Sequence, residues 1–235
     1  MSHLIAVEKS IIPACDVNMR VFEDIVRATA DLPQVGAYKI GAALALQEGL
    51  SVVAKVARKH TSKPLIYDHQ KAGTDIPETG KLFAATLKTC GMDAVILFPL
   101  SGPATQTAWI RSAQEAGLHV LLGAHMTHER FLLTDGGFLD ASPLEKIYTN
   151  GASLGIQNYV VPGNKPKVIE RVRSLLTEQK VDPVFFAPGF IAQGGGLSDA
   201  AKVAGPRWHA IVGRALYEAR DIRKTAISLI GHLTY

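Results

Sequence analysis

The chain has 235 residues, of which 47% are hydrophobic and 20% are charged, and its net charge at pH 7 is +4. This composition supplies enough apolar material for a sizeable core and excludes an intrinsically disordered chain. Basic residues outnumber acidic residues by 25 to 21 without forming a basic run interleaved with aromatics, so we expect no nucleic-acid partner. The mild positive surplus suits an anionic small-molecule substrate.

Cysteine content and hydropathy indicate the cellular compartment in which we expect the protein. Cys15 and Cys90 are too few for a disulfide framework or a metal cluster, which favours a reducing compartment. The opening residues lack the apolar stretch of a signal peptide, and no segment approaches the ~20 apolar residues that a membrane span needs. We therefore expect a soluble, cytoplasmic protein without a membrane partner.

Short β-branched segments alternate with amphipathic segments along the whole chain, which is typical of repeated βα units around a parallel sheet. The predicted strands are 10–17, 37–41, 64–69, 94–99, 119–126, 153–161, 183–189 and 209–216. The predicted helices between them include 44–59, 77–90, 103–116 and 164–178. Because a barrel of eight such units takes ~250 residues, we predict an α/β fold with one TIM (β/α)8 barrel domain over residues 1–235. An open doubly wound sheet is the alternative, and the first strand lacks the Gly-x-Gly-x-x-Gly motif that would favour it.

Polar residues stand at the ends of several predicted strands. Asp16 ends the first strand, Lys39 lies near the end of the second and Asp68 ends the third, while Gly213 and Arg214 lie toward the end of the eighth. The C-terminal ends of the strands form the active-site face of a TIM barrel. Because a buried charge is costly unless it is paired or used, these residues together indicate a functional site.

The most informative segment follows the third strand, where residues 68–79 read Asp-His-Gln-Lys-Ala-Gly-Thr-Asp-Ile-Pro-Glu-Thr. This segment resembles the Asp-x-Lys-x-x-Asp-Ile-Pro signature of the orotidine 5′-phosphate decarboxylase family. Lys39 in the second strand strengthens the similarity, and matching motifs continue to APGFIAQGGG at 187–196 and IVGRALYE at 211–218. The resemblance implies a TIM barrel that decarboxylates orotidine 5′-phosphate to uridine 5′-phosphate in pyrimidine biosynthesis, without a cofactor.

The spacing of this segment departs from the family signature. Two residues instead of one separate Asp68 from Lys71, and three instead of two separate Lys71 from Asp75. Either the segment bulges and returns both groups to their usual places, or another register applies to Lys71. Gly73 permits unusual backbone angles and Lys71 is the only lysine of the segment, which favours the bulge. An ordinary turn into a helix near Pro77 is the alternative without a function.

The chemistry of the reaction explains the alternating charges. Loss of CO₂ from C6 of the pyrimidine leaves a carbanion that no neighbouring π system delocalises effectively, so a fixed cation must stabilise it. Lys71 is the candidate for this cation and for the proton donor. Asp68 and Asp75 would keep Lys71 charged and oriented, and Lys39 would balance the two carboxylates. These four residues form the predicted catalytic network.

The resemblance also implies substrate contacts and a partner. The second Asp of the family signature and the following Ile reach the active site of the neighbouring subunit, so Asp75 and Ile76 imply a homodimer with shared sites. Asp16 and Thr79 correspond to residues that bind the ribose hydroxyls. Thr127 corresponds to a serine that contacts the pyrimidine.

A phosphate site is predicted at the last two strands. Gln193 and Gly194 open a glycine-rich loop after the seventh strand, and Gly213 and Arg214 follow the apolar part of the eighth. The loops after these two strands frequently bind phosphate in TIM barrels, where glycines allow close backbone approach and an arginine offers a bidentate fork. By resemblance, Gln193 lies on a loop that closes over the ligand, and Pro188 lines the base pocket.

Two other functions compete with this interpretation. The related 3-keto-gulonate 6-phosphate decarboxylases and hexulose 6-phosphate synthases use Mg²⁺ and resemble one another in an acidic residue at strand two, where the Lys39 of this chain would repel the ion. A catalytically silent, phosphometabolite-binding barrel is the third possibility, favoured only by the longer Asp68 to Asp75 segment. His125 and His128 suggest a metal pair, but no third ligand completes it, so we expect neither a metal nor a cofactor.

Overall fold

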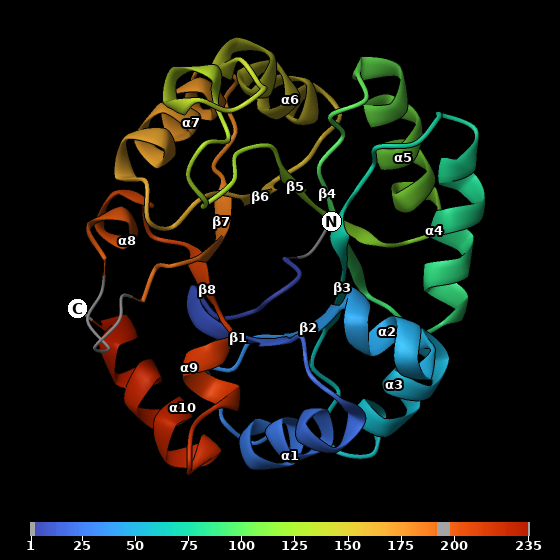
Figure 1. Cartoon of the computed structure of the whole chain (residues 1–235), viewed down its shortest axis with the longest axis vertical. Coiled ribbons are helices and arrows are strands. Elements are labelled where there is room, and N and C mark those ends of the chain that lie inside the picture. The colour runs from blue at the N-terminus through green and yellow to red at the C-terminus, as the bar shows by residue number, and fades with distance from the viewer. Residues whose placement is uncertain (1–2, 192–197, 235) are drawn as a thin grey trace.

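The computed structural model describes residues 3–191 and 198–234, and it describes residues 70–72 and 234 through their backbone only. Within these residues, eight parallel strands close into one barrel in chain order (Figure 1). The strands are β1 Lys9–Cys15, β2 Tyr38–Gly41, β3 Leu65–Ala72, β4 Ala94–Leu97, β5 His119–Gly123, β6 Asn158–Val160, β7 Val184–Pro188 and β8 Trp208–Val212. The predicted TIM barrel is confirmed, while the assignment of all of residues 1–235 to a single domain stays a prediction.

Helices form the outer layer around the strands (Figure 1). They are α1 Met19–Thr29, α2 Ala42–Glu48, α3 Leu50–Arg58, α4 Thr79–Thr89, α5 Pro103–Glu115, α6 Ala141–Ser153, α7 Pro166–Glu178, α8 Asp199–Val203, α9 Arg214–Tyr217 and α10 Ile222–Gly231, with short 3₁₀ turns η1 Leu133–Asp135 and η2 His232–Thr234. Asn18, Asp140, Ser198 and Asp221 each accept a hydrogen bond from a first-turn backbone N–H, which is the standard polar start of a helix. Local chemistry thus sets where several of the helices begin.

Several predicted boundaries are wrong, and the backbone gives the reasons. The predicted helix 44–59 is two helices, because Gly49 has a φ of +77° and breaks it. The predicted strand 153–161 is shortened to β6, because α6 continues to Ser153 and Gly155 turns the chain with a φ of +79°. The predicted strand 209–216 ends at Val212, and α9 begins two residues later.

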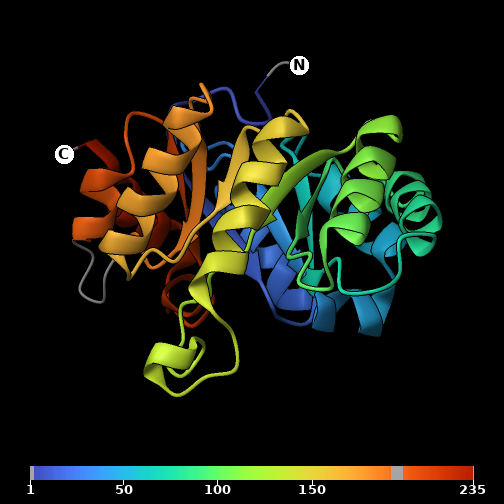
Figure 2. The ribbon, with the colours of Figure 1, turned by 90° about the horizontal axis from the view of Figure 1, so that it is seen from above.

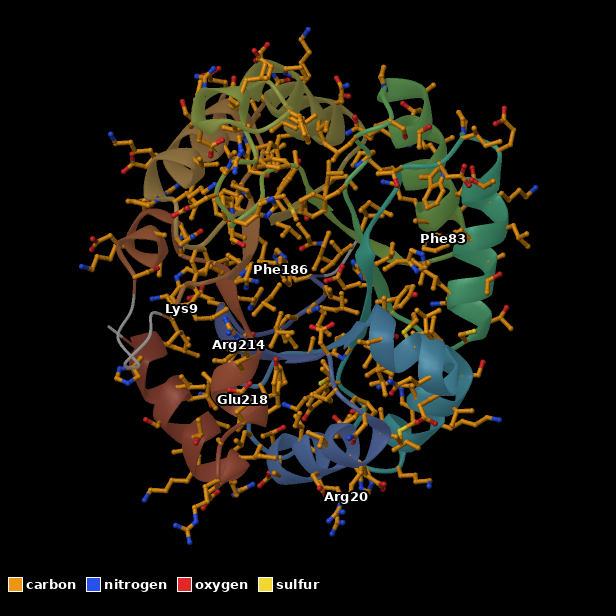
Figure 3. The ribbon with its side chains drawn as sticks, in the orientation of Figure 1. Lys9, Arg20, Phe83, Phe186, Arg214 and Glu218 are labelled. Atoms are coloured by element: carbon orange, nitrogen blue, oxygen red, sulfur yellow. The ribbon has the colours of Figure 1, made fainter. Side chains whose placement is uncertain are left out.

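Strand alternation separates an inner core from an outer one. Inside the barrel, residues such as Ile12, Ile66 and Phe186 pack on one another, and their neighbours in sequence pack outward against the helices. Figure 3 shows Phe186 inside the ring of strands and Phe83 outside it, near α4 and α5. The same alternation directs Lys39 and Asp68, which lie two residues beyond inward-facing Ala37 and Ile66, into the barrel.

The two ends of the barrel differ in shape. The chain enters at one end, and the connection between β5 and α6 protrudes from the other end, where the strands finish (Figure 2). Phe138 in this connection is 96% exposed. Among the residues that the structure describes, no helix has the length and apolarity to cross a membrane.

Candidate active site

A cavity of about 270 Å³ lies at the C-terminal ends of the strands. The described residues that line it are Ala14, Asp16, Lys39, Asp68, Ile96, Val160, Pro188, Ile211 and Gly213. An apolar wall with a few convergent polar groups is typical of a small-molecule site, and this end of a TIM barrel is where such sites occur. Five residues singled out from the sequence therefore meet in one cavity, although they come from five different βα units.

Lys39 lies at the centre of the polar side of this cavity. Its Nζ is 2.9 Å from Asp68 Oδ2 and 3.2 Å from Asp16 Oδ2. Burial alone would lower the pKa of Lys39, but the carboxylates of Asp68 and then Asp16 outweigh that effect and hold the pKa above its ordinary value. Lys39 is therefore a fixed positive charge inside the barrel.

Gly41 makes room for the Asp16 carboxylate. A Cβ atom added at Gly41 would lie 1.8 Å from Asp16 Oδ1, so any larger residue would displace that side chain. The φ of Gly41 is −81°, which every residue adopts, so space rather than backbone freedom calls for glycine here. Gly41 was not among the residues predicted for the site, although it ends an apolar strand two residues after Lys39.

The third strand is irregular where the family spacing is exceeded. The prediction that Asp68 ends this strand is wrong, because β3 continues to Ala72. Tyr67 pairs with Val95 and Ala72 with Leu97, so β3 advances by five residues where β4 advances by two. A backbone irregularity therefore stands where the sequence predicts a bulge. The side chain of Lys71 lies outside the described part of the chain.

The next residues of the signature lie on the surface, away from the cavity lining. Asp75 is exposed, and its backbone oxygen accepts hydrogen bonds from Thr105 Oγ1 at 2.8 Å and Ser101 Oγ at 3.3 Å. Ile76 is 58% exposed, and its backbone oxygen accepts a hydrogen bond from Thr79 Oγ1. Within one chain, the structure does not bring these three signature residues to Lys39 and Asp68.

The structure describes only some of the residues that were predicted to contact the phosphate and the base. Gly213 follows β8 at the cavity, and exposed Arg214 opens α9, close to the ring of strands (Figure 3). Gln193 and Gly194 lie outside the described residues. Thr127 is half-buried, and its backbone oxygen accepts a hydrogen bond from Asn164, but Thr127 is not among the described residues that line the cavity.

Comparison with known proteins places the chain in a family. Residues 9–228 match the profile described as the Orotidine 5'-phosphate decarboxylase / HUMPS family. The chain belongs to this family. It is 32% identical to the orotidine 5'-phosphate decarboxylase of Methanosarcina barkeri over 215 residues, which cover 91% of this chain and 89% of that protein. It is 28% identical to the corresponding protein of Methanosphaera stadtmanae over 229 residues, which cover 95% and 97%.

Solved structures support the same fold. The orotidine 5'-monophosphate decarboxylase of Methanocaldococcus jannaschii, complexed with the inhibitor BMP, superposes with a TM-score of 0.81 at 23% identity and covers 97% of this chain and 100% of that one. The orotidine 5'-phosphate decarboxylase of Pyrococcus horikoshii gives a TM-score of 0.78 at 24% identity, covering 96% and 99%. As a member of the decarboxylase family, the chain is an enzyme of the carboxy-lyase type.

His125 and His128, the pair that the sequence suggested as metal ligands, are not among the described residues that line the cavity. His125 is buried, and its ring stacks on Tyr148 with centroids 6.2 Å apart. Burial, followed by the charge of Lys165, lowers the pKa of His125, which favours the neutral ring. In residues 3–191 and 198–234, no three His, Cys, Asp or Glu side chains gather closely enough to hold a metal ion.

Proposed function

We propose that the chain converts orotidine 5′-phosphate to uridine 5′-phosphate without a cofactor, through a carbanion at C6 of the pyrimidine. The observation that carries this proposal is the contact of Lys39 with Asp68 and Asp16 inside the cavity at the C-terminal end of the barrel. Buried charges at hydrogen-bond distance in a substrate-sized cavity provide preorganised electrostatics of the kind that stabilises a charged transition state. Family membership supports the same reaction.

Lys71 supplies the cation beside C6 and then the proton that replaces CO₂. The register shift between Tyr67 and Ala72 supports the bulge that this role of Lys71 requires at the lengthened spacing.

Each remaining member of the network has a separate role in this proposal. Asp68, together with Asp75 of a second copy of the chain, keeps Lys71 charged and oriented, while Lys39 balances the charge of Asp68 and holds its carboxylate in place. Asp16, at the mouth of the cavity and in contact with Lys39, binds the ribose hydroxyls. Pro188, on the wall of the cavity, lines the base pocket, and the Thr127 hydroxyl contacts the pyrimidine.

The phosphate binds to Gly213, Arg214, Gln193 and Gly194. Gly213 lies at the cavity and Arg214 is exposed directly after it, so the arginine can turn to the ligand without disturbing the core. A guanidinium forms two parallel hydrogen bonds to a phosphate, which fixes its orientation as well as its position. Binding energy gathered here positions the pyrimidine at the charged end of the cavity.

Asp75 and Ile76 complete the site of a second copy of the chain in a homodimer, and Thr79 binds the ribose hydroxyls. Asp75 and Ile76 are exposed, and two hydroxyl donors fix the backbone at Asp75, so the pair forms a firm surface feature that a neighbouring subunit can receive. The cytoplasmic location of the enzyme stays a prediction.

The magnesium-dependent reaction of the related sugar-phosphate enzymes suits this site less well. Lys39 Nζ occupies the position between Asp16 and Asp68 where a divalent ion would need both carboxylates. Replacing that ammonium by a metal would require Lys39 to leave a buried position in which the two carboxylates stabilise its charge.

One assay tests the proposal against its alternatives. The purified chain is mixed with orotidine 5′-phosphate, with and without EDTA, and loss of the orotate absorbance is followed. We expect equal turnover in both samples. Turnover that requires added Mg²⁺ would favour the metal-dependent reaction, and tight binding without turnover would favour a silent binding barrel; either result overturns the proposal.

A further inference from the structure

An aromatic row lies along the outer face of β3, beside α4 and α5, and its member His69 is exposed. It consists of Tyr67 and His69 in β3, Phe83 in α4 and Trp109 in α5. Ring centroids are 5.4 Å apart between Tyr67 and His69, 5.7 Å between His69 and Phe83, and 4.8 Å between Phe83 and Trp109. Figure 3 shows Phe83 on this outer side of the barrel. These rings form one continuous contact path.

Polar contacts fasten the two ends of this row to the chain around Lys71. At one end, the Tyr67 hydroxyl lies 2.5 Å from His69 Nδ1, and the residue between them, Asp68, is held by Lys39 on the inner face. At the other end, Trp109 Nε1 donates a hydrogen bond to the backbone oxygen of Ile76 at 3.0 Å. The row therefore connects residues 67–69 with residue 76.

The segment between these two anchors, residues 70–75, contains Lys71 and the irregular part of β3. Its far end has further support, because Ser101 and Thr105 donate to the backbone oxygen of Asp75. A chain segment with both ends fixed has few ways to cross the gap between them. The packing of helices α4 and α5 thus limits the path of the segment.

We propose that His69 is a positioning residue for the decarboxylation. Its ring contacts both Tyr67 in β3 and Phe83 in α4, and these contacts fix the backbone path of the segment that contains Lys71. His69 acts through the backbone and touches no reacting atom. Trp109 fixes the opposite end of the same span. The inference rests on the proposed function, in which Lys71 is the proton donor, and it explains how the lengthened segment is kept in one conformation.

The test compares His69→Ala with His60→Ala, a histidine on another face that contacts Glu23. We expect kcat for orotidine 5′-phosphate to fall on the order of 10- to 100-fold in His69→Ala, because a displacement of about 1 Å of a catalytic group can cost about 100-fold. KM should stay within about twofold, since the phosphate contacts are elsewhere. His60→Ala should keep both constants.

Two further variants separate positioning from simple support of the fold. His69→Asn keeps a polar atom near the place of Nδ1, so it should recover part of kcat. Trp109→Phe keeps a ring beside Phe83 but removes the donor to Ile76, so it should lower kcat with little change in KM. Normal kcat in folded His69→Ala, or a lower melting temperature with unchanged kcat, would overturn the inference.

Hydrogen–deuterium exchange distinguishes failure of the inference from failure of the proposed function. We expect amides of residues 70–75 to exchange faster in His69→Ala than in the wild-type chain, while β6 and β7 are unchanged. If the wild-type chain does not decarboxylate the substrate, the proposed function fails, and exchange alone decides whether the row restrains the segment. Unchanged exchange of residues 70–75 contradicts that restraint in either case.

Discussion

Two buried polar side chains lie at opposite ends of the same barrel and differ in their hydrogen-bond partners. His209 lies near the N-terminal end of β8 and is 1% exposed; its Nδ1 is 2.8 Å from the hydroxyl oxygen of Ser10, and its ring packs on Phe186. Lys39 lies near the C-terminal end of β2 and is 6% exposed, between the carboxylates of Asp68 and Asp16. One group has a neutral partner, and the other has two charged ones.

The partners decide which group keeps its charge. Burial, helped by the charges of Arg207 and His3, lowers the pKa of His209 to about 3, so the ring is neutral at physiological pH. Burial also opposes the charge of Lys39, but the two carboxylates raise its pKa above the ordinary value. The buried histidine at the N-terminal end is thus neutral, whereas the buried lysine at the C-terminal end keeps its charge beside a cavity. Retained charge marks the end that can do chemistry.

The largest combined effect is expected from Asp68→Asn, which removes the nearest carboxylate from Lys39. We expect kcat to fall at least about 100-fold, because the network loses the group that orients its lysines. The free energy of unfolding should fall by roughly 3 kcal/mol, since breaking one partner of a buried pair is costly. Steady-state kinetics and urea unfolding measure the two effects. Asp31→Asn, at the exposed pair with Arg223, is the control and should change little.

A second effect is expected at the phosphate end of the cavity. Arg214→Ala should raise KM about 10- to 100-fold, because a hydrogen bond to a charged group contributes about 1.5–3 kcal/mol. The value of kcat should change much less than in Asp68→Asn, since Arg214 lies at the phosphate and not at C6. An unchanged KM would remove Arg214 from the binding site.

The packing of Asp16 gives a smaller prediction. Gly41→Ala should push the Asp16 carboxylate away from Lys39, because the new Cβ would overlap Asp16 Oδ1. We expect kcat/KM to fall about tenfold and the protein to lose about 1–3 kcal/mol from overpacking. Gly231→Ala in α10 is the control, because nothing lies within 4 Å of a Cβ placed there. Equal kinetics for the two variants would show that Asp16 needs no such space.

The smallest effect at neutral pH is expected for His209, at the N-terminal end of the barrel, where a substitution should change the pH dependence of the free energy of unfolding. The unfolded chain protonates His209 below about pH 6.5, whereas the folded chain does so only near pH 3. Folding therefore loses about 1.4 kcal/mol of stability per pH unit as pH falls through this window. His209→Asn keeps a polar partner for Ser10 but does not titrate. Its unfolding free energy should fall less steeply with decreasing pH than that of the wild-type chain, and parallel curves would contradict the assignment.

Much of the barrel and part of the site follow from sequence patterns. The eight strands were predictable because apolar β-branched segments recur at regular spacing, and Asp16, Lys39 and Asp68 were predictable because charges that end such strands need partners. The strand boundaries at 153–161 and 209–216 were not, since α6 extends farther and α9 begins earlier than local hydropathy indicates. Local patterns do not contain the packing that decides these ends.

The segment from Asp68 to Asp75 shows a second limit of prediction from sequence. The spacing between Asp68 and Asp75 predicts a bulge, and β3 does shift its register against β4 there. The role of Trp109 and Phe83 could not be predicted, because they join this segment from helices that are distant in sequence. Contacts that depend on how two helices pack on one strand have no counterpart in a local motif.

Lys71 is the proposed proton donor of the decarboxylation, and the other charges of the network keep it in place. The most direct measurement is kcat for orotidine 5′-phosphate in Lys71→Ala, with the affinity for uridine 5′-phosphate measured alongside to show that the site is intact. We expect turnover to be nearly abolished while nucleotide binding is retained. A Lys71→Ala enzyme with normal kcat would contradict the claim.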